Sequence, residues 1–298
     1  MSELLDKLRT GRVLLLDGAM GTTLQNRGLE PGVCPESFNV SHPDIVQQIV
    51  EEYVAAGSDI VETNSFGGSR YKLQHFGLED KTFEFNMLAA QISRRAAGRK
   101  ALVAGSVGPT GQFLQPLGDE SQVDMYQAFK EQTEALAAGG ADVIFIETMM
   151  ALEEAQVAYR AVRENTQIPV VVSFTFEKNA RGQYRTLMGV SPEQIAREFT
   201  QAGADIIGSN CGAGIQQLTE ICRQLRQHTD KYILIKPNAG LPVLRDGKTV
   251  FNDTPEQMAE YVDELLECGV NLFGGCCGTT AEHIKAFRKK LDDRLTAG

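Results

Sequence analysis

The sequence contains no tryptophan, only four histidines and no run of lysines and arginines. Its 29 basic and 39 acidic residues give a formal charge of −10, which argues against nucleic acid or an anionic membrane as a partner. No run of about 18 apolar residues is present, so no membrane-spanning helix is predicted. The charged start, MSELLDKLRTGRV, lacks the apolar core of a signal peptide. These absences predict a soluble, cytoplasmic protein.

Six cysteines are present among the 298 residues. In a large chain without an export signal, reduced thiols or a metal site are expected rather than three disulfides. The four histidines, His42, His75, His228 and His283, fall in predicted loops or helices. Neither a histidine metal site nor a histidine general base is therefore predicted.

One alternation repeats along the chain: a short β-branched run, a turn, and an amphipathic segment that often ends in AG or CG. Eight strand candidates occur: RVLLLDG, DIVETNSF, ALVAGSVGP, ADVIFIET, PVVVSFTF, ADIIGSNC, YILIKPNAG and NLFGGCC. Helical patterns lie between them, as in residues 43–57 and 255–269. Helix starts at Ser191 and Thr254 combine an N-cap hydroxyl, a proline and a later glutamine. Eight such units predict a single (β/α)₈ TIM barrel, residues 1–298, with a doubly wound open sheet as the alternative.

In such a barrel, polar residues at the carboxyl ends of the strands face one mouth, where these enzymes keep their chemistry. Three of the six cysteines fall there: Cys211 after the sixth strand, and Cys276 and Cys277 after the eighth. Adjacent strand residues point to opposite faces, so both thiols of the pair serve one site only if the backbone leaves strand geometry, which Gly274 and Gly275 allow. The other polar strand-end residues are Asp17, Glu62, Asn64, Glu147, Asn210 and Asn238.

Three thiolates at one mouth suit Zn²⁺, and three protein ligands leave a fourth position open for catalysis. The alternatives for the adjacent pair are buried small apolar side chains or a vicinal disulfide. A zinc ion on three thiolates carries excess negative charge and is a poor Lewis acid for hydrolysing esters or amides. It can instead take up a thiol, lower the pKa of that thiol and leave its sulfur electron-rich, as alkylation of sulfur requires.

Seven motifs in order, LLLDGAMGT, VETNSFG, VAGSVGPTG, FIET, GSNCGAG, KPNAGLP and FGGCCGTT, resemble the homocysteine S-methyltransferase family over residues 14–291. They are most similar to the homocysteine-binding barrel of cobalamin-dependent methionine synthases. The resemblance implies that Cys211, Cys276 and Cys277 hold one zinc ion and that the homocysteine sulfur completes the tetrahedron. It implies that Asn238 approaches the metal when no thiol is bound. The implied reaction is methyl transfer to homocysteine, which forms methionine.

The resemblance also implies which residues bind the amino acid end of homocysteine. Main-chain N–H groups of the first loop would face the substrate carboxylate. That loop consists of Asp17, Gly18, Ala19, Met20 and Gly21. Glu147 would pair with the substrate ammonium group, or alternatively with a neighbouring Lys or Arg. Asp17 before a glycine is also a strong turn signal. The resemblance implies that Asn210 also binds the substrate. The alternative is that Asn210 forms hydrogen bonds that brace its own loop.

The methyl donor is the part of the reaction that the motifs leave open. Methionine synthases of this type continue into folate, cobalamin and activation modules, which are not expected in this sequence, and no phosphate loop or nicotinamide fingerprint is evident. The loop after the second strand favours a methylated corrinoid protein, acting in trans, as donor. S-Methylmethionine and betaine are the alternatives, although an aromatic cage for betaine would have to form without tryptophan.

Two other classes of function use the same residues. A zinc-storing or redox-sensing protein would hold the three thiols without catalysis and would not need Asp17 and Glu147 opposite the metal. A lyase or aldolase on the same barrel would use Lys236, near the end of the seventh strand, to form a Schiff base.

The contacts that would select the thiol acceptor are mostly main-chain. No outer helix has an exceptional apolar face that would indicate an oligomer.

Overall fold

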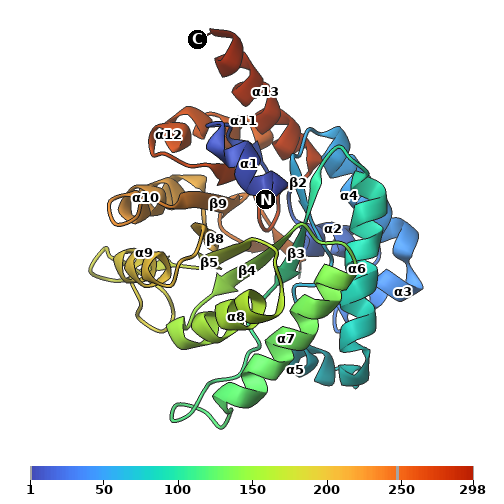
Figure 1. Ribbon diagram of the computed structural model, residues 1–298. Coiled ribbons are helices and arrows are strands. Elements are labelled where there is room, and N and C mark those ends of the chain that lie inside the picture. Colours follow the sequence, from blue (N-terminus) through green and yellow to red (C-terminus); the bar gives the residue numbers. More distant parts are fainter. Residues whose placement is uncertain (1, 246–247, 298) are drawn as a thin grey trace.

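The computed structural model describes residues 2–245 and 248–297, in which eight parallel strands are surrounded by helices (Figure 1). Met1, Asp246, Gly247 and Gly298, which the predicted domain 1–298 includes, lie outside the described residues. The strands of the main sheet are β1 (Leu14–Leu15), β2 (Ile60–Glu62), β3 (Leu102–Val107), β4 (Val143–Met149), β5 (Val170–Phe174), β8 (Ile206–Gly214), β9 (Tyr232–Asn238) and β12 (Leu272–Phe273). Each overlaps one of the eight predicted strand segments.

The main sheet closes on itself. Its strand order is β1-β12-β9-β8-β5-β4-β3-β2, and every neighbouring pair is parallel. A single bridge between Leu16 and Ile60 joins the two ends of this order. The predicted (β/α)₈ barrel is therefore confirmed, and the open sheet, whose strand order would reverse at a switch point, is wrong.

Each strand is followed by helices that return the chain along the outside of the barrel (Figure 1). They are α2 (Met20–Asn26), α3 (Phe38–Ser41) and α4 (Pro43–Ala55) after β1; α5 (Arg70–Gln74) and α6 (Thr82–Ala97) after β2; α7 (Gln122–Ala138) after β3; α8 (Leu152–Asn165) after β4; α9 (Pro192–Gln201) after β5; α10 (Ile215–Arg226) after β8; α11 (Pro255–Ala259) and α12 (Val262–Glu267) after β9; and α13 (Ala281–Ala297) after β12.

Smaller elements lie in the connections at the mouth of the barrel. Two short hairpins are β6 (Glu177–Lys178) with β7 (Tyr184–Arg185), and β10 (Val243–Arg245) with β11 (Lys248–Val250). Two 3₁₀ turns, η1 (Pro35–Ser37) and η2 (Glu79–Lys81), lie in the connections after β1 and β2. Among the described residues, no helix combines the length and the apolar character needed to cross a bilayer.

The predicted helix starts at Ser191 and Thr254 are confirmed. Each side chain accepts a hydrogen bond from the backbone N–H three residues later, and the glutamine at that position bonds back to the N-cap N–H. The helical pattern of residues 255–269 is interrupted, because the N–H of Tyr261 bonds to the carbonyl of Met258, only three residues back. This tightened turn separates α11 from α12.

Alternate residues of each strand belong to two different apolar clusters, as the two-residue period of a strand requires. On β9, Leu234 belongs to the cluster inside the barrel, whereas Ile233 and Ile235 belong to the one between strands and helices. Leu4 and Leu8 of α1 (Glu3–Arg9) join the inner cluster, so α1 covers the amino-terminal end of the barrel (Figure 1). Polar inward residues can therefore occur only beyond this apolar layer, toward the mouth.

Candidate functional site

The next inward positions along three strands carry charged side chains. Glu62, Glu147 and Lys236 each lie two residues beyond an inner-cluster residue. Lys236 Nζ lies 3.0 Å from Glu147 Oε2 and forms a second ion pair with Glu62, and each of the three side chains is at most 10% exposed. The alternative partner for Glu147, a neighbouring lysine, is thus present. These ion pairs were not predicted, although the two-residue period of each strand places the three side chains on the inner face.

Three carboxyl groups share this one lysine. Asp17 Oδ2 accepts the backbone N–H of Glu62 at 2.7 Å, while Asp17 Oδ1 is buried with no hydrogen-bond partner among the described residues. Burial raises the pKa of Asp17 to about 7, and burial, with Glu147 nearby, also raises the pKa of Glu62. One lysine therefore cannot neutralise all three carboxyl groups when they are ionised.

Lys236 itself is held in the charged form. Burial opposes a positive charge there, but Glu147 and Glu62 outweigh it and raise the pKa of Lys236 above its ordinary value. A Schiff base needs the neutral amine as its nucleophile. The aldolase alternative therefore has no support in the geometry.

The three predicted cysteines converge at the mouth. The Sγ atoms of Cys211, Cys276 and Cys277 lie within 4.8 Å of one another, and those of Cys211 and Cys277 are 3.9 Å apart. Cys211 lies on β8 and the pair follows β12, with β9 between them. Two sulfurs on a tetrahedral ion with bonds of about 2.3 Å would be roughly 3.8 Å apart. All six cysteines are free and these three are only partly buried, so the trio suits zinc, not a disulfide or a core role.

The backbone has left strand geometry before the cysteine pair, as expected, since β12 ends at Phe273. Glycine is required at positions 274 and 275 for a different reason from the one predicted. Neither has a positive φ, and a Cβ on Gly275 would overlap the side chain of Thr279. The left-handed glycine of this loop is Gly278, at φ 80°. Close packing, rather than a special turn, therefore requires the glycine pair.

Hydrogen bonds among the three thiols give them different pKa values. Bonds from Cys276 and Cys277 lower the pKa of Cys211 to about 3. The contact with Cys211 raises the pKa of Cys276 to about 11 and raises the pKa of Cys277 even more. Asn238 contributes a further bond to Cys211, and its buried Oδ1 has no partner among the described residues. The cluster therefore offers a cation one thiolate, two thiols and an unsatisfied amide oxygen.

The first loop lies against the cysteine loop. The N–H of Gly275 donates to the carbonyl of Asp17 at 2.9 Å, and the N–H of Ala19 donates to the carbonyl of Thr279 at 3.3 Å. The hydroxyl of Tyr53 on α4 donates to the carbonyl of Ala19 at 2.9 Å. Tyr53 lies in the helical pattern predicted for residues 43–57, and nothing in its spacing indicated this bond. The predicted substrate loop and the thiols therefore share one wall of the mouth.

The remaining residues of the first loop differ in their surroundings. A Cβ on Gly18 would lie 2.9 Å from the Tyr53 ring, so packing alone explains this glycine. Met20 begins α2, and a Cβ on Gly21 would meet no atom within 4 Å. The open side of the loop is therefore at its end, where α2 starts.

Two other predicted residues have structural contacts. Asn64 donates to the carbonyl of Pro35 at 2.8 Å and to Asn39 Oδ1 at 3.1 Å, so it joins two loops outside the thiol cluster. Asn210 is fully buried and bonds to the ends of β4 and β5 through Thr148 and Ser173. The bracing role that the sequence allowed for Asn210 is therefore present.

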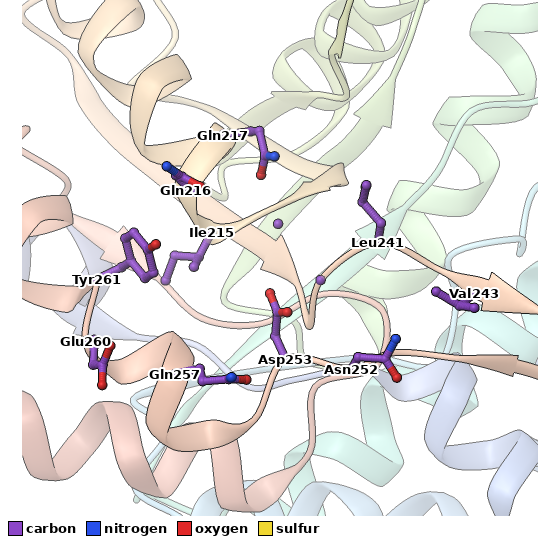
Figure 2. A pocket seen from close by; sticks show the side chains of 12 residues that line it. Ile215, Gln216, Gln217, Leu241, Val243, Asn252, Asp253, Gln257, Glu260 and Tyr261 are labelled. Atoms are coloured by element: carbon purple, nitrogen blue, oxygen red, sulfur yellow. The ribbon is translucent and has the colours of Figure 1, made fainter.

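A pocket of about 580 Å³ opens at the ends of β8 and β9 (Figure 2). It was not predicted, because its walls come from separate segments that only the fold brings together. Asp253 points into its centre, while Glu260 and Tyr261 lie at one edge (Figure 2). No lysine or arginine lines it in the described part of the chain. Its lining residues are Gly214, Ile215, Gln216, Gln217, Gly240, Leu241, Val243, Asn252, Asp253, Gln257, Glu260 and Tyr261.

Comparison with known families gives one match over nearly the whole chain. The model of the family described as homocysteine S-methyltransferase matches residues 14–291. The methionine synthase of Mycobacterium leprae is 34% identical over 294 residues, which cover 92% of this chain and 24% of that protein. The methionine synthase of Mycobacterium tuberculosis is 35% identical over 304 residues, or 95% of this chain and 25% of that protein. The chain thus spans about a quarter of the length of these relatives.

Solved structures show the same fold. The metallated form of the homocysteine methyltransferase MmuM from Escherichia coli superposes with a TM-score of 0.79 at 24% identity, covering 96% of this chain and 98% of that one. The apo form of MmuM gives a TM-score of 0.73 at the same identity and coverage. At this level of identity the likeness concerns the barrel.

Proposed function

The chain belongs to the homocysteine S-methyltransferase family, and on that premise we propose that it transfers a methyl group to the sulfur of homocysteine and forms methionine. The observation that carries the proposal is the convergence of Cys211, Cys276 and Cys277 at the barrel mouth, above a buried layer of carboxyl groups. A small amino acid with a thiol needs both features, one for its sulfur and one for its ammonium group.

Zinc is the metal that this donor set fits. Cys211, Cys276 and Cys277 would hold it, and Asn238 Oδ1, buried without a partner, would lie beside it when no thiol is bound. Zinc on three thiolates lowers the pKa of an added thiol, so that homocysteine can react as its anion near neutral pH. The sulfur spacing and the orphaned amide oxygen both support this assignment.

The amino acid end of the substrate would complete the carboxyl layer. Asp17, Glu62 and Glu147 share Lys236 as their only buried cation among the described residues, so a substrate ammonium group would add a second positive charge beside them. Glu147 Oε2 and Cys276 Sγ both lie within 4 Å of Asn210 Nδ2, so sulfur and ammonium partners are close enough for one short molecule. Main-chain N–H groups at the open end of loop 17–21 would face its carboxylate.

The methyl transfer is a displacement at carbon. The thiol proton leaves first, the sulfur then attacks the methyl carbon, and the S–C bond forms as the donor–carbon bond breaks. The electron pair of the broken bond stays with the donor. The residues of this chain hold the nucleophile and the amino acid end, so the donor must align the methyl group from the open side of the mouth.

We infer that the donor is a methylated corrinoid carried by a protein. Every exposed large apolar side chain of the described residues lies between the end of a barrel strand and the last helix that follows this strand, or in the first two residues of that helix. Where such side chains lie together, they are typical of a docking site. We call this set of side chains the mouth surface, and it consists of Val33, Val40, Phe66, Phe76, Phe83, Phe113, Leu117, Val123, Leu187, Met188, Leu241, Val243 and Leu244.

The mouth surface allows a direct test of a protein donor. Leu117 and Leu244 are 75% and 77% exposed, so glutamate at either position should fold normally and repel an apolar partner. Leu117→Glu and Leu244→Glu are expected to lower turnover with a methylated corrinoid protein and to leave turnover with free methylcobalamin unchanged. Lys100→Glu, at the opposite end of the barrel, is the control. Equal loss with both donors, or with the control, would contradict a docking role.

The metal assignment is tested by single cysteine variants. Purified protein should contain about one zinc per chain, because three converging thiols match the number of protein ligands in one catalytic zinc site. Cys211→Ala, Cys276→Ala and Cys277→Ala should each lose most zinc and most homocysteine methylation, while Cys222→Ala, in α10, should keep both. Full zinc in a Cys276→Ala, Cys277→Ala double variant would refute the site. Added homocysteine should change the metal's coordination, and an unchanged coordination would favour a storage or sensing protein.

The pocket at the ends of β8 and β9 supports a second candidate donor. Two acidic residues, Asp253 and Glu260, and the ring of Tyr261 suit a small sulfonium or quaternary ammonium compound such as S-methylmethionine or betaine. Under this alternative, Asp253→Asn should raise KM for S-methylmethionine and leave turnover with methylcobalamin unaffected. Saturable turnover with S-methylmethionine and none with any methylcorrinoid would replace the corrinoid donor by this one.

A further inference from the structure

Asn210 is the side chain that contacts both halves of the proposed site. It lies on β8, directly before Cys211, and is fully buried. Its Oδ1 accepts the backbone N–H of Thr148 at 2.8 Å and the hydroxyl of Ser173 at 2.6 Å. Its Nδ2 donates to Thr148 Oγ1 at 2.7 Å. One amide group therefore joins the ends of three neighbouring strands.

These partners fix the orientation of the amide. The backbone N–H of Thr148 can only donate, so the atom that faces it must be Oδ1. Nδ2 consequently points the other way, where Glu147 Oε2 lies at 3.5 Å and Cys276 Sγ at 3.9 Å. One N–H is used by Thr148 Oγ1, and the second is directed between a carboxylate and a thiol.

The backbone next to Asn210 is strained at two places. Thr148 has φ 61° and Cys211 has φ 59°, and they are the only residues other than glycine with positive φ in the described chain. For a β-branched residue such as threonine this conformation is a true outlier, held only by its surroundings. Two bonds from Asn210 hold Thr148 in place, and this fixes the direction of the preceding residue, Glu147.

We propose that Asn210 is a positioning residue that couples the carboxylate of Glu147 to the sulfur of Cys276. The proposal rests on the proposed function, in which these two groups bind the ammonium end of homocysteine and the metal. Its N–H disperses charge on the Cys276 thiolate and fixes the direction of that sulfur. Outer-shell bonds of this kind are typically worth about 10- to 100-fold in metal affinity. In this proposal Asn210 acts through its hydrogen bond to Cys276 and does not touch the substrate.

The test uses Co²⁺, which replaces zinc at thiolate sites and absorbs through sulfur-to-metal charge transfer. Asn210→Ala should bind Co²⁺ and Zn²⁺ about 10- to 100-fold more weakly than the wild type. Its charge-transfer band should move to lower energy, because a thiolate without an N–H partner is more electron-rich. KM for homocysteine should also rise, since Glu147 loses its fixed direction.

Two further variants separate this role from simple bracing. Asn210→Asp keeps acceptor oxygens for Thr148 and Ser173 but loses the N–H that faces the sulfur, so it should show the same direction of band shift even where the alanine variant folds poorly. Ser173→Ala removes a bracing bond only and should leave the band in place. An unmoved band and unchanged metal affinity in both Asn210 variants would overturn the proposal. These readouts need no methyl donor, so failure of methyl transfer in the wild type would count against the proposed function alone.

Discussion

Replacing Lys236 by methionine should destabilise the protein strongly. Lys236 is the buried partner of both Glu62 and Glu147, and the three side chains are 2%, 10% and 6% exposed. Methionine has a similar length but no charge, so the two carboxyl groups would be left buried without their cation. Removing one partner of such a buried ion pair costs about 3–5 kcal/mol. This is a large part of the total of about 5–15 kcal/mol that most native proteins have.

Thermal and urea unfolding would measure the effect. Tm should fall by roughly 6–20 °C, since each kcal/mol is worth about 2–4 °C in a chain of this order of size. The deficit should be larger at pH 8 than at pH 5. Burial raises the pKa of Glu62, so the folded state keeps a proton that the unfolded chain has released, and stability falls as pH rises through this window. The methionine variant, which lacks the lysine, should show this loss more steeply.

Two comparisons make the experiment decisive. Adding Glu62→Gln and Glu147→Gln to the methionine variant should restore much of the stability, because the two carboxyl groups that pair with Lys236 are then neutral amides. Arg70→Met, which breaks the exposed pair with Glu131, should cost less than about 1 kcal/mol. If Lys236→Met also costs less than about 1 kcal/mol at pH 8, the reasoning about the buried charge layer is wrong.

Three other predictions follow from single features. Zinc binding to metal-free protein near pH 7 should release about two protons, because the pKa of Cys211 is lowered to about 3 while the pKa values of Cys276 and Cys277 are raised; calorimetry in buffers of different ionisation enthalpy would detect a different number. Asp17→Asn should gain stability relative to the wild type between pH 4 and pH 7, because burial raises the pKa of Asp17 to about 7 and the stability of its neutral form is lost over that window; parallel pH profiles in urea unfolding would contradict this. Ser191→Ala should cost about 1 kcal/mol by removing the α9 cap, whereas Arg197→Ala, on the exposed face of the same helix, should cost little, and equal losses in thermal unfolding would reject the capping effect.

Much of the barrel could be predicted because each strand is a short apolar run with a clear end. The same ends placed Cys211, Cys276 and Cys277 together, since parallel strands of one barrel finish at one mouth. The ion pairs of Lys236 could have been found by continuing the inward register of β9 by two residues beyond Leu234. An apolar register alone does not indicate that the next interior positions are charged and neutralise one another.

Other features depend on distances that no local pattern contains. The pocket combines the start of α10, the end of β9 and the turn between α11 and α12. The need for glycine at position 275 arises from Thr279, which packs where a Cβ would be. The bracing of Thr148 by Asn210 joins residues 62 positions apart. Such contacts follow from the closed barrel rather than from the sequence around each residue.

The thiol cluster lies beside the seam at which the barrel closes. β1 is held on one side by two residue pairs with β12, in which Leu14 is opposite Leu272, and on the other by a single bridge. Because these partners are so distant along the chain, loop-closure entropy makes the seam a late event in folding. The cysteine pair follows β12 immediately, and Gly275 is bonded to Asp17 across the seam. An ion held by all three thiols would join the end of β12 to the end of β8, so a chain in which β12 has not yet docked would display separated thiols and no complete metal site.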